Sequence, residues 1–276
     1  MDYDGHMSFA RIANWVRWRL SDMLRRITNL KVHDAREPNR VWEVYTLRKL
    51  FANASIDCVF DVGANAGQYA TMLRRDVGFR GLIVSFEPTP TLARRLRRLA
   101  RRDPLWIVEE VALSDTDGTA TFNVMVDDQF SSLHAPSAQH VQGFETLNSV
   151  SDSLTVKTER LDTAYARLFG SHNFQRPFLK MDTQGHDTTI ARASPAAVGK
   201  FIGLQSELSF LPLYAGSERF DVALDLYERY GLVLSALMPN NAGHFPDLVE
   251  CDCVMVRPDS LAIRSNRPGI APVIVS

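Results

Sequence analysis

Two polar clusters in this sequence contain residue types that could bind or react with a ligand. The first is Asp61-Val62-Gly63-Ala64-Asn65-Ala66-Gly67-Gln68, which follows the apolar run Cys58-Val59-Phe60. The second is Lys180-Met181-Asp182-Thr183-Gln184-Gly185-His186, which follows another apolar run. A glycine loop lets the backbone approach a ligand, and an acid, a lysine or a histidine can position a reacting group or move its proton.

The glycine cluster has the context of a nucleotide-binding loop, because it lies between a predicted strand and a predicted helix. Gly63 would allow a tight turn after the strand, and Gly67 would let the start of the helix approach a ligand. A helix N-terminus suits an anionic group such as a carboxylate. The alternative is a tight strand–helix turn that binds nothing.

Acids follow two successive predicted strands. Asp61 ends the first strand, and Glu87 ends the next, 20 residues beyond the glycine loop. An acid at the position of Asp61 suits a cationic ligand such as S-adenosylmethionine better than a pyrophosphate, and an acid at that of Glu87 can accept ribose hydroxyls. Ser114 and Asp115 follow the third strand, where they either contact adenine or cap a turn.

Hydrophobic periodicity predicts alternating strands and helices. Strands are expected near 58–60, 82–86, 106–112, 119–126, 154–160, 177–182, 202–208, 231–237 and 249–256, and helices at 40–52, 68–76, 90–102, 161–169, 186–193 and 217–230. This alternation indicates an α/β fold with a mostly parallel sheet and right-handed crossovers. We predict a domain at 53–258, an N-terminal helical extension at 1–52 and a C-terminal tail at 259–276.

Four motifs, in this order, resemble the FkbM-type family of S-adenosylmethionine-dependent methyltransferases. They are DVGANAGQY at 61–69, SFEP at 85–88, ALSD at 112–115 and LKMDTQGHD at 179–187. The resemblance covers approximately residues 55–257. It implies a Rossmann-like sheet of seven strands with the last one antiparallel and helices on both faces. It also implies O-methylation of a hydroxyl on a sugar, a glycolipid or a glycosylated natural product.

The resemblance also implies roles for individual residues. By position, Asp61, Gly63, Asn65 and Gly67 would cradle the cofactor, Glu87 would bind ribose, Ser114 and Asp115 would lie near adenine, and Asp182 would face the methyl group. Three residues depart from the family pattern. The family often has Glu where this chain has Gln184 and where it has Asp187, and commonly has an aromatic or small residue where it has His186.

Methyl transfer to a hydroxyl needs an aligned acceptor and a group that takes its proton. Asp182 is predicted to orient or deprotonate that hydroxyl. Lys180, two residues earlier on the same face of the strand, would tune the carboxylate or anchor a substrate oxygen. His186 is the alternative base. A divalent metal on Asp182, His186 and Glu207 is a further alternative, and we predict no metal.

The polar segment 127–152 is long for a loop and is predicted to cover the acceptor. The predicted acceptor-binding residues are Ser131, Ser132, His134, Glu207 and Tyr214. The turn at 240–244 follows a later strand and would line the same pocket.

Basic charge is concentrated in the first part of the chain. Residues 1–102 contain 19 Lys and Arg against 10 Asp and Glu, whereas the whole chain has a net charge of −1. The arginine-rich segments 8–30 and 90–102 are predicted to be amphipathic helices, whose arginines either face solvent or contact an anionic membrane surface through 8–30. Because no aromatic-interleaved basic motif occurs, we predict no nucleic-acid partner.

The sequence has neither an apolar run of 18 residues nor a signal-peptide pattern, and its three cysteines lack zinc-like spacing. These features favour a cytoplasmic protein with buried free thiols. Two other functions stay open at this point. One is an NAD-dependent oxidoreductase, and the other is a cofactor-binding adaptor without catalysis.

Overall fold

A computed structural model describes residues 38–137, 149–239 and 246–261 of the chain. The helix predicted at 8–30, the turn at 240–244, most of the C-terminal tail and the middle of the predicted cover segment lie outside these residues. Among the described helices, none is long and apolar enough to cross a membrane.

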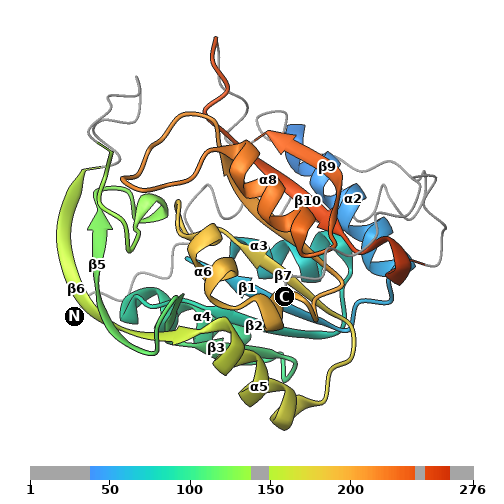
Figure 1. Ribbon diagram of the computed structural model, residues 1–276. Coiled ribbons are helices and arrows are strands. Elements are labelled where there is room, and N and C mark those ends of the chain that lie inside the picture. Colours follow the sequence, from blue (N-terminus) through green and yellow to red (C-terminus); the bar gives the residue numbers. More distant parts are fainter. Residues whose placement is uncertain (1–37, 138–148, 240–245, 262–276) are drawn as a thin grey trace.

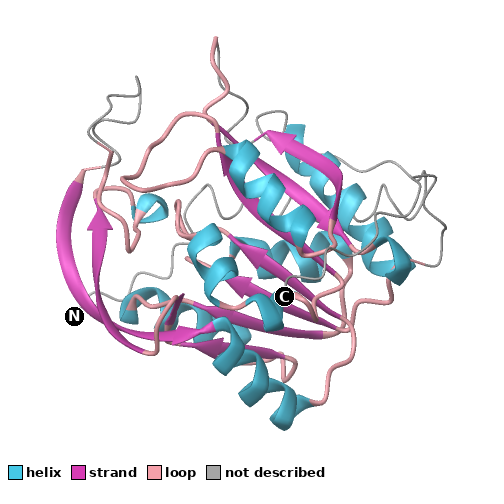
Figure 2. Ribbon diagram, viewed as in Figure 1, coloured by secondary structure: helices cyan, strands magenta, loops and turns pink. Residues whose placement is uncertain are grey.

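The core of the fold is a seven-stranded sheet with the order β3-β2-β1-β7-β8-β10-β9 (Figures 1 and 2). Its strands are β1 (Cys58–Val62), β2 (Leu82–Phe86), β3 (Trp106–Glu109), β7 (Pro177–Met181), β8 (Gly203–Ser209), β9 (Val233–Pro239) and β10 (Glu250–Val256). β1 pairs in parallel with β2 and β7, whereas β10 is antiparallel to both β8 and β9. The predicted fold class is therefore confirmed.

Helices cover both faces of this sheet. One face carries α2 (Pro38–Asn53), α3 (Gln68–Met72), the π-helix η1 (Leu73–Val77) and α4 (Pro90–Ala100), and the other carries α5 (Leu161–His172), α6 (Asp187–Ala193), α7 (Pro195–Val198) and α8 (Phe220–Arg229). All of β1 is buried, with Val59 in the core under α2 and Phe60 in the core under α5. Burial on both faces is typical of a parallel strand between two helical layers.

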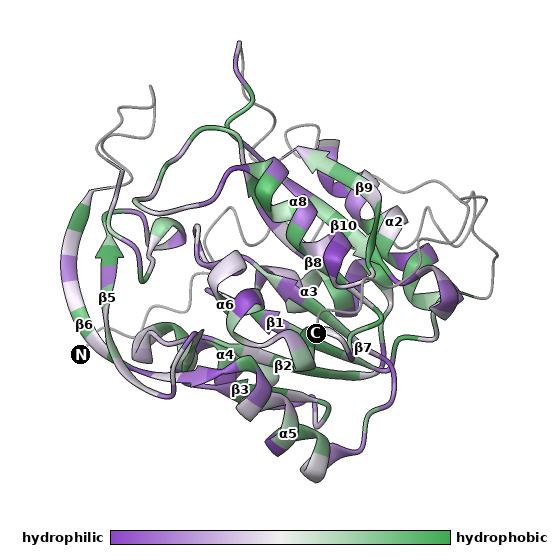
Figure 3. Cartoon of the chain, in the orientation of Figure 1, coloured by the Kyte–Doolittle hydropathy of each residue, from purple (hydrophilic) through white to green (hydrophobic). Residues whose placement is uncertain are grey.

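Helices α4 and α8 are amphipathic, with their apolar residues against the sheet. Figure 3 shows hydrophobic and hydrophilic residues on the same helix in α8. In α4, Leu92 and Leu96 are buried, whereas Leu99, on the next turn of the helix, is 47% exposed. Cys58, Cys251 and Cys253 are buried and unpaired, as the sequence predicted.

A second, three-stranded sheet stands beside the first (Figure 1). It consists of β4 (Ala112–Ser114), β5 (Gly118–Met125) and β6 (Val150–Arg160), with β6 in the middle. The strand predicted at 106–112 is confirmed at its start and is interrupted after Glu109. β3 pairs with β2 in the main sheet, whereas β4 begins at Ala112 and pairs with β6 in the second sheet. The short 3₁₀ helices η2 (Asp128–Phe130) and η3 (Pro258–Ser260) follow β5 and β10.

One row of buried polar residues crosses the main sheet on the face covered by α2. Ser85, Asp61, Lys180 and Gln205 are register partners on β2, β1, β7 and β8. An isolated buried polar group is costly, but neighbouring strands here place polar groups side by side. The row lies near the carboxyl ends of the parallel strands, where open α/β sheets bind ligands.

The turn after β1 provides a first test. Gly63 has φ +73°, and an added Cβ would lie 1.9 Å from the carbonyl oxygen of Asp182, whereas Gly78 has φ +82° and nothing within 4 Å. We expect Gly78→Ala to lower the free energy of unfolding by about 1–2 kcal/mol through its backbone conformation alone. Gly63→Ala should lower the free energy of unfolding by at least twice as much, because the backbone carbonyl of Asp182 must also move to make room for the methyl group. Urea denaturation measures both, and equal losses would contradict the close contact with Asp182.

Candidate active site

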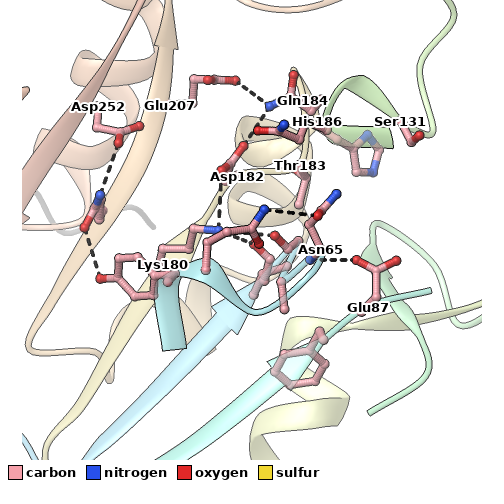
Figure 4. A pocket seen from close by; sticks show the side chains of 18 of the residues that line it. Asn65, Glu87, Ser131, Lys180, Asp182, Thr183, Gln184, His186, Glu207 and Asp252 are labelled. Atoms are coloured by element: carbon pink, nitrogen blue, oxygen red, sulfur yellow. Dashed lines mark hydrogen bonds and ion pairs between the residues drawn. The ribbon is translucent and has the colours of Figure 1, made fainter. Parts of the chain in front are cut away.

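A cavity of about 520 Å³ opens at the carboxyl ends of β1, β2 and β7 and continues along β8 and β10. This volume is in the range of small-molecule sites. One half of the cavity is lined by α4, β2 and β4, and the other by α2, β8 and β10. Figure 4 shows polar side chains from both halves meeting at Lys180 and Asp182.

The first half of the cavity combines an apolar slot with one carboxylate. The slot is lined by Phe86, Leu92, Val111, Ala112, Leu113 and Phe122. Glu87, at the end of β2, lies at the side of this slot and is 4% exposed. An apolar slot beside a hydrogen-bond acceptor suits a planar base joined to a sugar.

Two backbone amides hold the Glu87 carboxylate in place. Its Oε2 accepts the N–H of Asn65 at 2.9 Å, and its Oε1 accepts the N–H of Thr89 at 2.8 Å. Burial raises the pKa of Glu87 to about 7, although both amides favour the ionised form. Asn65 has φ +45°, a conformation that asparagine tolerates better than most residues. The glycine loop therefore positions Glu87 through the backbone of Asn65.

The two glycines of the loop serve different contacts. Gly63 lines the cavity and lies against the backbone of Asp182. Gly67 does not line the cavity, and an added Cβ would lie 2.8 Å from the Leu96 side chain of α4. Gly67 thus lets the start of α3 pack on α4, rather than approach a ligand directly.

Asp61 is fully buried behind the cavity wall. Its Oδ2 accepts a hydrogen bond from the Ser85 hydroxyl at 3.1 Å, and its Oδ1 lies 3.4 Å from the Nζ of Lys180. Asp61 does not line the cavity, so the cation that it contacts in this structure is Lys180. The sequence suggested a cationic ligand there, and the register of β1 and β7 supplies a cationic side chain instead.

Lys180 links the buried row to the cavity. Its Nζ donates to the carbonyl of Gly63 at 3.2 Å and lies 3.5 Å from Oδ2 of Asp182. Burial opposes the charge of Lys180, but the carboxylates of Asp182 and Asp61 raise its pKa above the ordinary value. Lys180 is therefore a fixed cation between two acids.

Asp182 is the acid that faces the cavity. Its side chain is 40% exposed, and its Oδ1 accepts a hydrogen bond from the Gln184 amide at 2.7 Å (Figure 4). The same amide donates to Oε2 of Glu207 at 3.3 Å. Gln184 has φ +55°, so the turn after β7 holds a strained residue where its amide reaches two carboxylates.

Gln184 is one of the three departures from the family pattern, and the structure gives it a physical role. Its Oε1 accepts a hydrogen bond from the Tyr214 hydroxyl, which leaves its NH₂ group pointing at Asp182 and Glu207. A glutamate at this position would offer no such donors when ionised. Tyr214, a predicted acceptor contact, is 2% exposed and orients Gln184 from behind the cavity wall.

His186 lines the cavity, but both of its ring nitrogens are engaged. Nε2 lies 3.1 Å from the Ser114 hydroxyl, and Nδ1 lies 3.0 Å from Nε2 of His134. Burial lowers the pKa of His186 to about 4, so the ring is neutral. Neither ring nitrogen of His186, the alternative base, is therefore available to take the proton of an acceptor hydroxyl. Ser114 also donates to Asp115 at 3.1 Å, and neither residue lines the cavity.

The described part of the predicted cover segment lines the cavity with Gln129, Phe130, Ser131 and Leu133, of which Ser131 is a predicted acceptor contact. Ser132 is fully buried and donates to the carbonyl of Gln184 at 2.8 Å. It therefore ties the segment to the turn after β7 instead of contacting the cavity. His134 reaches the site through His186, and Glu207 lines it directly.

Sequence reasoning missed several polar residues of the second half of the cavity. They are Glu43, Tyr69, Gln205, Glu250 and Asp252. The Gln205 amide donates to Glu43 at 2.9 Å and to Asp252 at 3.2 Å, and its carbonyl accepts from Tyr69 at 3.0 Å. The acids of β10 had a sequence signal, because residues two apart on a strand share a face.

Within the described residues, no group of three or more His, Cys, Asp or Glu side chains is arranged to hold a metal ion. The alternative site on Asp182, His186 and Glu207 is therefore not assembled. The nitrogens of His186 contact Ser114 and His134 instead.

Comparison with known families decides the class of protein to which this site belongs. Residues 61–233 match the family described as the methyltransferase FkbM domain. The chain belongs to the FkbM methyltransferase family. The predicted family and enzyme class are thus confirmed, and the oxidoreductase alternative falls away. No curated protein matched the chain.

Solved structures with a similar chain path include other methyltransferases. An FkbM methyltransferase from Methylobacillus flagellatus KT has 13% identity and a TM-score of 0.43, with 88% of this chain and 59% of that chain covered. A putative methyltransferase from Thermobifida fusca YX has 11% identity and a TM-score of 0.45, with 79% of this chain and 80% of that chain covered.

Replacement of Lys180 tests whether it balances Asp61 in this FkbM-family enzyme. Lys180→Met leaves the fully buried carboxylate of Asp61 without its cation, and we expect the free energy of unfolding to fall by about 3–5 kcal/mol. Urea denaturation measures the loss, and Lys157→Met, at an exposed lysine, is the matched control. Adding Asp61→Asn to Lys180→Met should recover part of the loss. A double variant with strictly additive losses would contradict the pairing.

Proposed function

We propose that this methyltransferase binds S-adenosylmethionine in the cavity and transfers its methyl group to a hydroxyl of a sugar, a glycolipid or a glycosylated natural product. The observation that carries the proposal is the position of Asp182. Its carboxylate is fixed by Lys180 and Gln184 at the junction of the two cavity halves. An acid at this junction can lie beside both the methyl group of the cofactor and the hydroxyl that receives it.

The residues of the first half fit the nucleoside part of S-adenosylmethionine. Glu87, held by two backbone amides, offers carboxylate oxygens to the ribose hydroxyls. The apolar slot between β4 and α4 suits adenine, and Gly63 keeps the turn after β1 free of a side chain. When bound, S-adenosylmethionine supplies an activated methyl group on a sulfonium.

The chain's own residues then act on the acceptor. Asp182 accepts the hydrogen bond of the acceptor hydroxyl and takes its proton as the oxygen attacks, a contribution of about 10²–10⁴-fold for a positioned base. Lys180 and Gln184 keep the carboxylate in one orientation, so that the hydroxyl is aligned before it reacts. His186 supports the turn after β7 through His134 and Ser114.

The second half of the cavity suits an acceptor with many hydrogen-bond donors. Glu207, Glu250 and Asp252 line it with carboxylate oxygens, which accept hydrogen bonds from hydroxyl groups. A sugar offers several such donors in a small volume. A cytoplasmic location, and contact of residues 8–30 with a membrane surface, remain predictions from the sequence.

The first test concerns the cofactor. Because the pKa of Glu87 is about 7, the carboxylate is lost as the pH falls through that value, and we expect the affinity for S-adenosylhomocysteine to fall with it. Glu87→Gln should lower the affinity at pH 8 by about 10–100-fold and flatten its pH dependence. Calorimetry at several pH values measures both effects, with Glu110→Gln as the control. If Glu87→Gln bound S-adenosylhomocysteine as tightly as the wild type, Glu87 would not be the residue that binds the ribose.

The second test concerns the reaction. Asp182→Asn keeps the shape of the side chain but cannot take a proton, so we expect methyl transfer to fall by about 10²–10⁴-fold. The affinity for S-adenosylhomocysteine should stay close to that of the wild type. Transfer of labelled methyl groups from S-adenosylmethionine to a panel of glycosides provides the measurement. A fully active Asp182→Asn enzyme would show that another group performs this step.

A further inference from the structure

The two helical layers of this protein differ in the sign of their charge. The helices on the α2 face, which are α2, α3, η1 and α4, contain nine Lys and Arg against two Asp and Glu. The helices on the opposite face, α5 to α8, contain three against five. Of the two acids on the α2 face, Glu43 lines the cavity and Asp76 forms an ion pair with Arg40 at 3.1 Å. The outer surface of this layer is therefore positive.

Helix α4 contributes most of this charge. Its exposed basic residues are Arg94, Arg95, Arg97 and Arg98 within the helix and Arg101 and Arg102 directly after it. Arg97 forms an ion pair with Glu110 at 2.6 Å. The other five arginines form no ion pair with a carboxylate of the described residues, although Arg94 donates to the hydroxyl of Thr91 at 3.2 Å. Their guanidinium groups are thus open to an anionic partner.

Large apolar side chains are exposed on the same layer. Trp42 and Tyr45, on the outer side of α2, are 51% and 48% exposed, and their rings stack with 5.6 Å between the centroids. The Nζ of Lys49 lies 4.6 Å from the centroid of the Tyr45 ring. Leu99 is exposed beside the arginines of α4. Apolar side chains next to cations are typical of surfaces that lie in a membrane interface.

The charge and the apolar side chains together select among possible partners. A symmetric contact between two copies of this face would bring two positive surfaces together. Residues 1–37 contain seven Lys and Arg against five Asp and Glu, so they would not balance the arginines. A nucleic acid could pair with the arginines but gains nothing from an aliphatic side chain such as Leu99. A bilayer with anionic phospholipids uses both kinds of side chain.

The cavity reaches this layer at one edge. Asn39 and Arg40, in the first turn of α2, line the cavity, and so do Thr89 and Leu92 at the start of α4. The N-terminal ends of both helices therefore border the cavity at the carboxyl ends of the parallel strands. A surface that lay against the outer sides of α2 and α4 would pass beside the cavity.

We infer that the outer sides of α2 and α4 bind the surface of a membrane that contains anionic phospholipids. The arginines of α4 would pair with lipid phosphates, while Trp42, Tyr45 and Leu99 would enter the interface between headgroups and acyl chains. This contact goes beyond the proposed function and does not depend on it. Its consequence for the acceptor rests on that function, because a membrane beside the cavity favours a glycolipid among the proposed acceptors.

Sedimentation with lipid vesicles tests the inference on the full chain. One set of vesicles contains phosphatidylcholine alone, and the other contains phosphatidylcholine with phosphatidylglycerol. We expect the anionic vesicles to bind the protein about tenfold tighter or more, because several arginines act at the charged surface together. The binding should weaken as the salt concentration rises, since salt screens exposed charges.

The decisive variant combines Arg95→Gln, Arg98→Gln and Arg102→Gln. A basic side chain near an anionic surface contributes roughly fivefold to binding, so we expect the affinity for anionic vesicles to fall by about tenfold or more. Trp42→Ala leaves the charge unchanged and should still lower the affinity, by about threefold or more, if the ring enters the interface.

The matched control removes three positive charges from other exposed positions. It combines Lys157→Gln, Lys200→Gln and Arg229→Gln, and we expect its affinity for anionic vesicles to fall by less than about twofold. Residues 8–30 are the same in every variant, so the comparison reports on the outer sides of α2 and α4. The affinity of each variant for S-adenosylhomocysteine is measured in parallel and reports on the fold.

Four outcomes would overturn the inference. They are equal binding to neutral and anionic vesicles, undiminished binding by the arginine variant, equal losses in the arginine variant and the control, and tighter binding to duplex RNA than to vesicles of equal phosphate concentration. The last outcome would assign the arginines to a nucleic acid. In each case intact binding of S-adenosylhomocysteine would leave the proposed methyltransferase function standing. Loss of that binding in the wild-type protein would instead remove the proposed function and leave the vesicle result unchanged.

Discussion

The ammonium of Lys180 is buried between Asp61 and Asp182, and much of the site depends on this arrangement. A buried cation needs opposite charge and hydrogen-bond acceptors close by, and here it also donates to the carbonyl of Gly63. The contact joins the turn after β1 to the turn after β7. These two turns carry the glycine loop and the candidate catalytic acid, so one charged group sets their relative position.

Close packing of the backbone reinforces this charge arrangement. The carbonyl of Asp182 occupies the space that a side chain at position 63 would need, and its N–H donates to the carbonyl of Val62. Electrostatic attraction and steric contact therefore act between the same two turns. A rigid junction of this kind suits methyl transfer, since the reaction depends mainly on alignment of donor and acceptor.

The acceptor side of the cavity is built differently from the cofactor side. Its polar residues include Glu43 on α2 and Glu250 and Asp252 on β10, all outside the segment 61–233 that matches the family. The cofactor side, with Gly63, Asn65 and Glu87, lies within it. The matched segment therefore holds the whole nucleoside half of the cavity, whereas the other half combines residues within it, such as Glu207, with residues on either side of it.

The sequence by itself determined the α/β class, most strands and helices, the family, and the two clusters that follow β1 and β7. These features depend on local periodicity and short motifs, which neighbouring residues specify. Only the tertiary structure decided that Asp61 contacts Lys180, that His186 is engaged on both nitrogens, and that Gln205 connects Glu43 with Asp252. Sheet order and register create these contacts between residues far apart in the chain, and no local pattern encodes them.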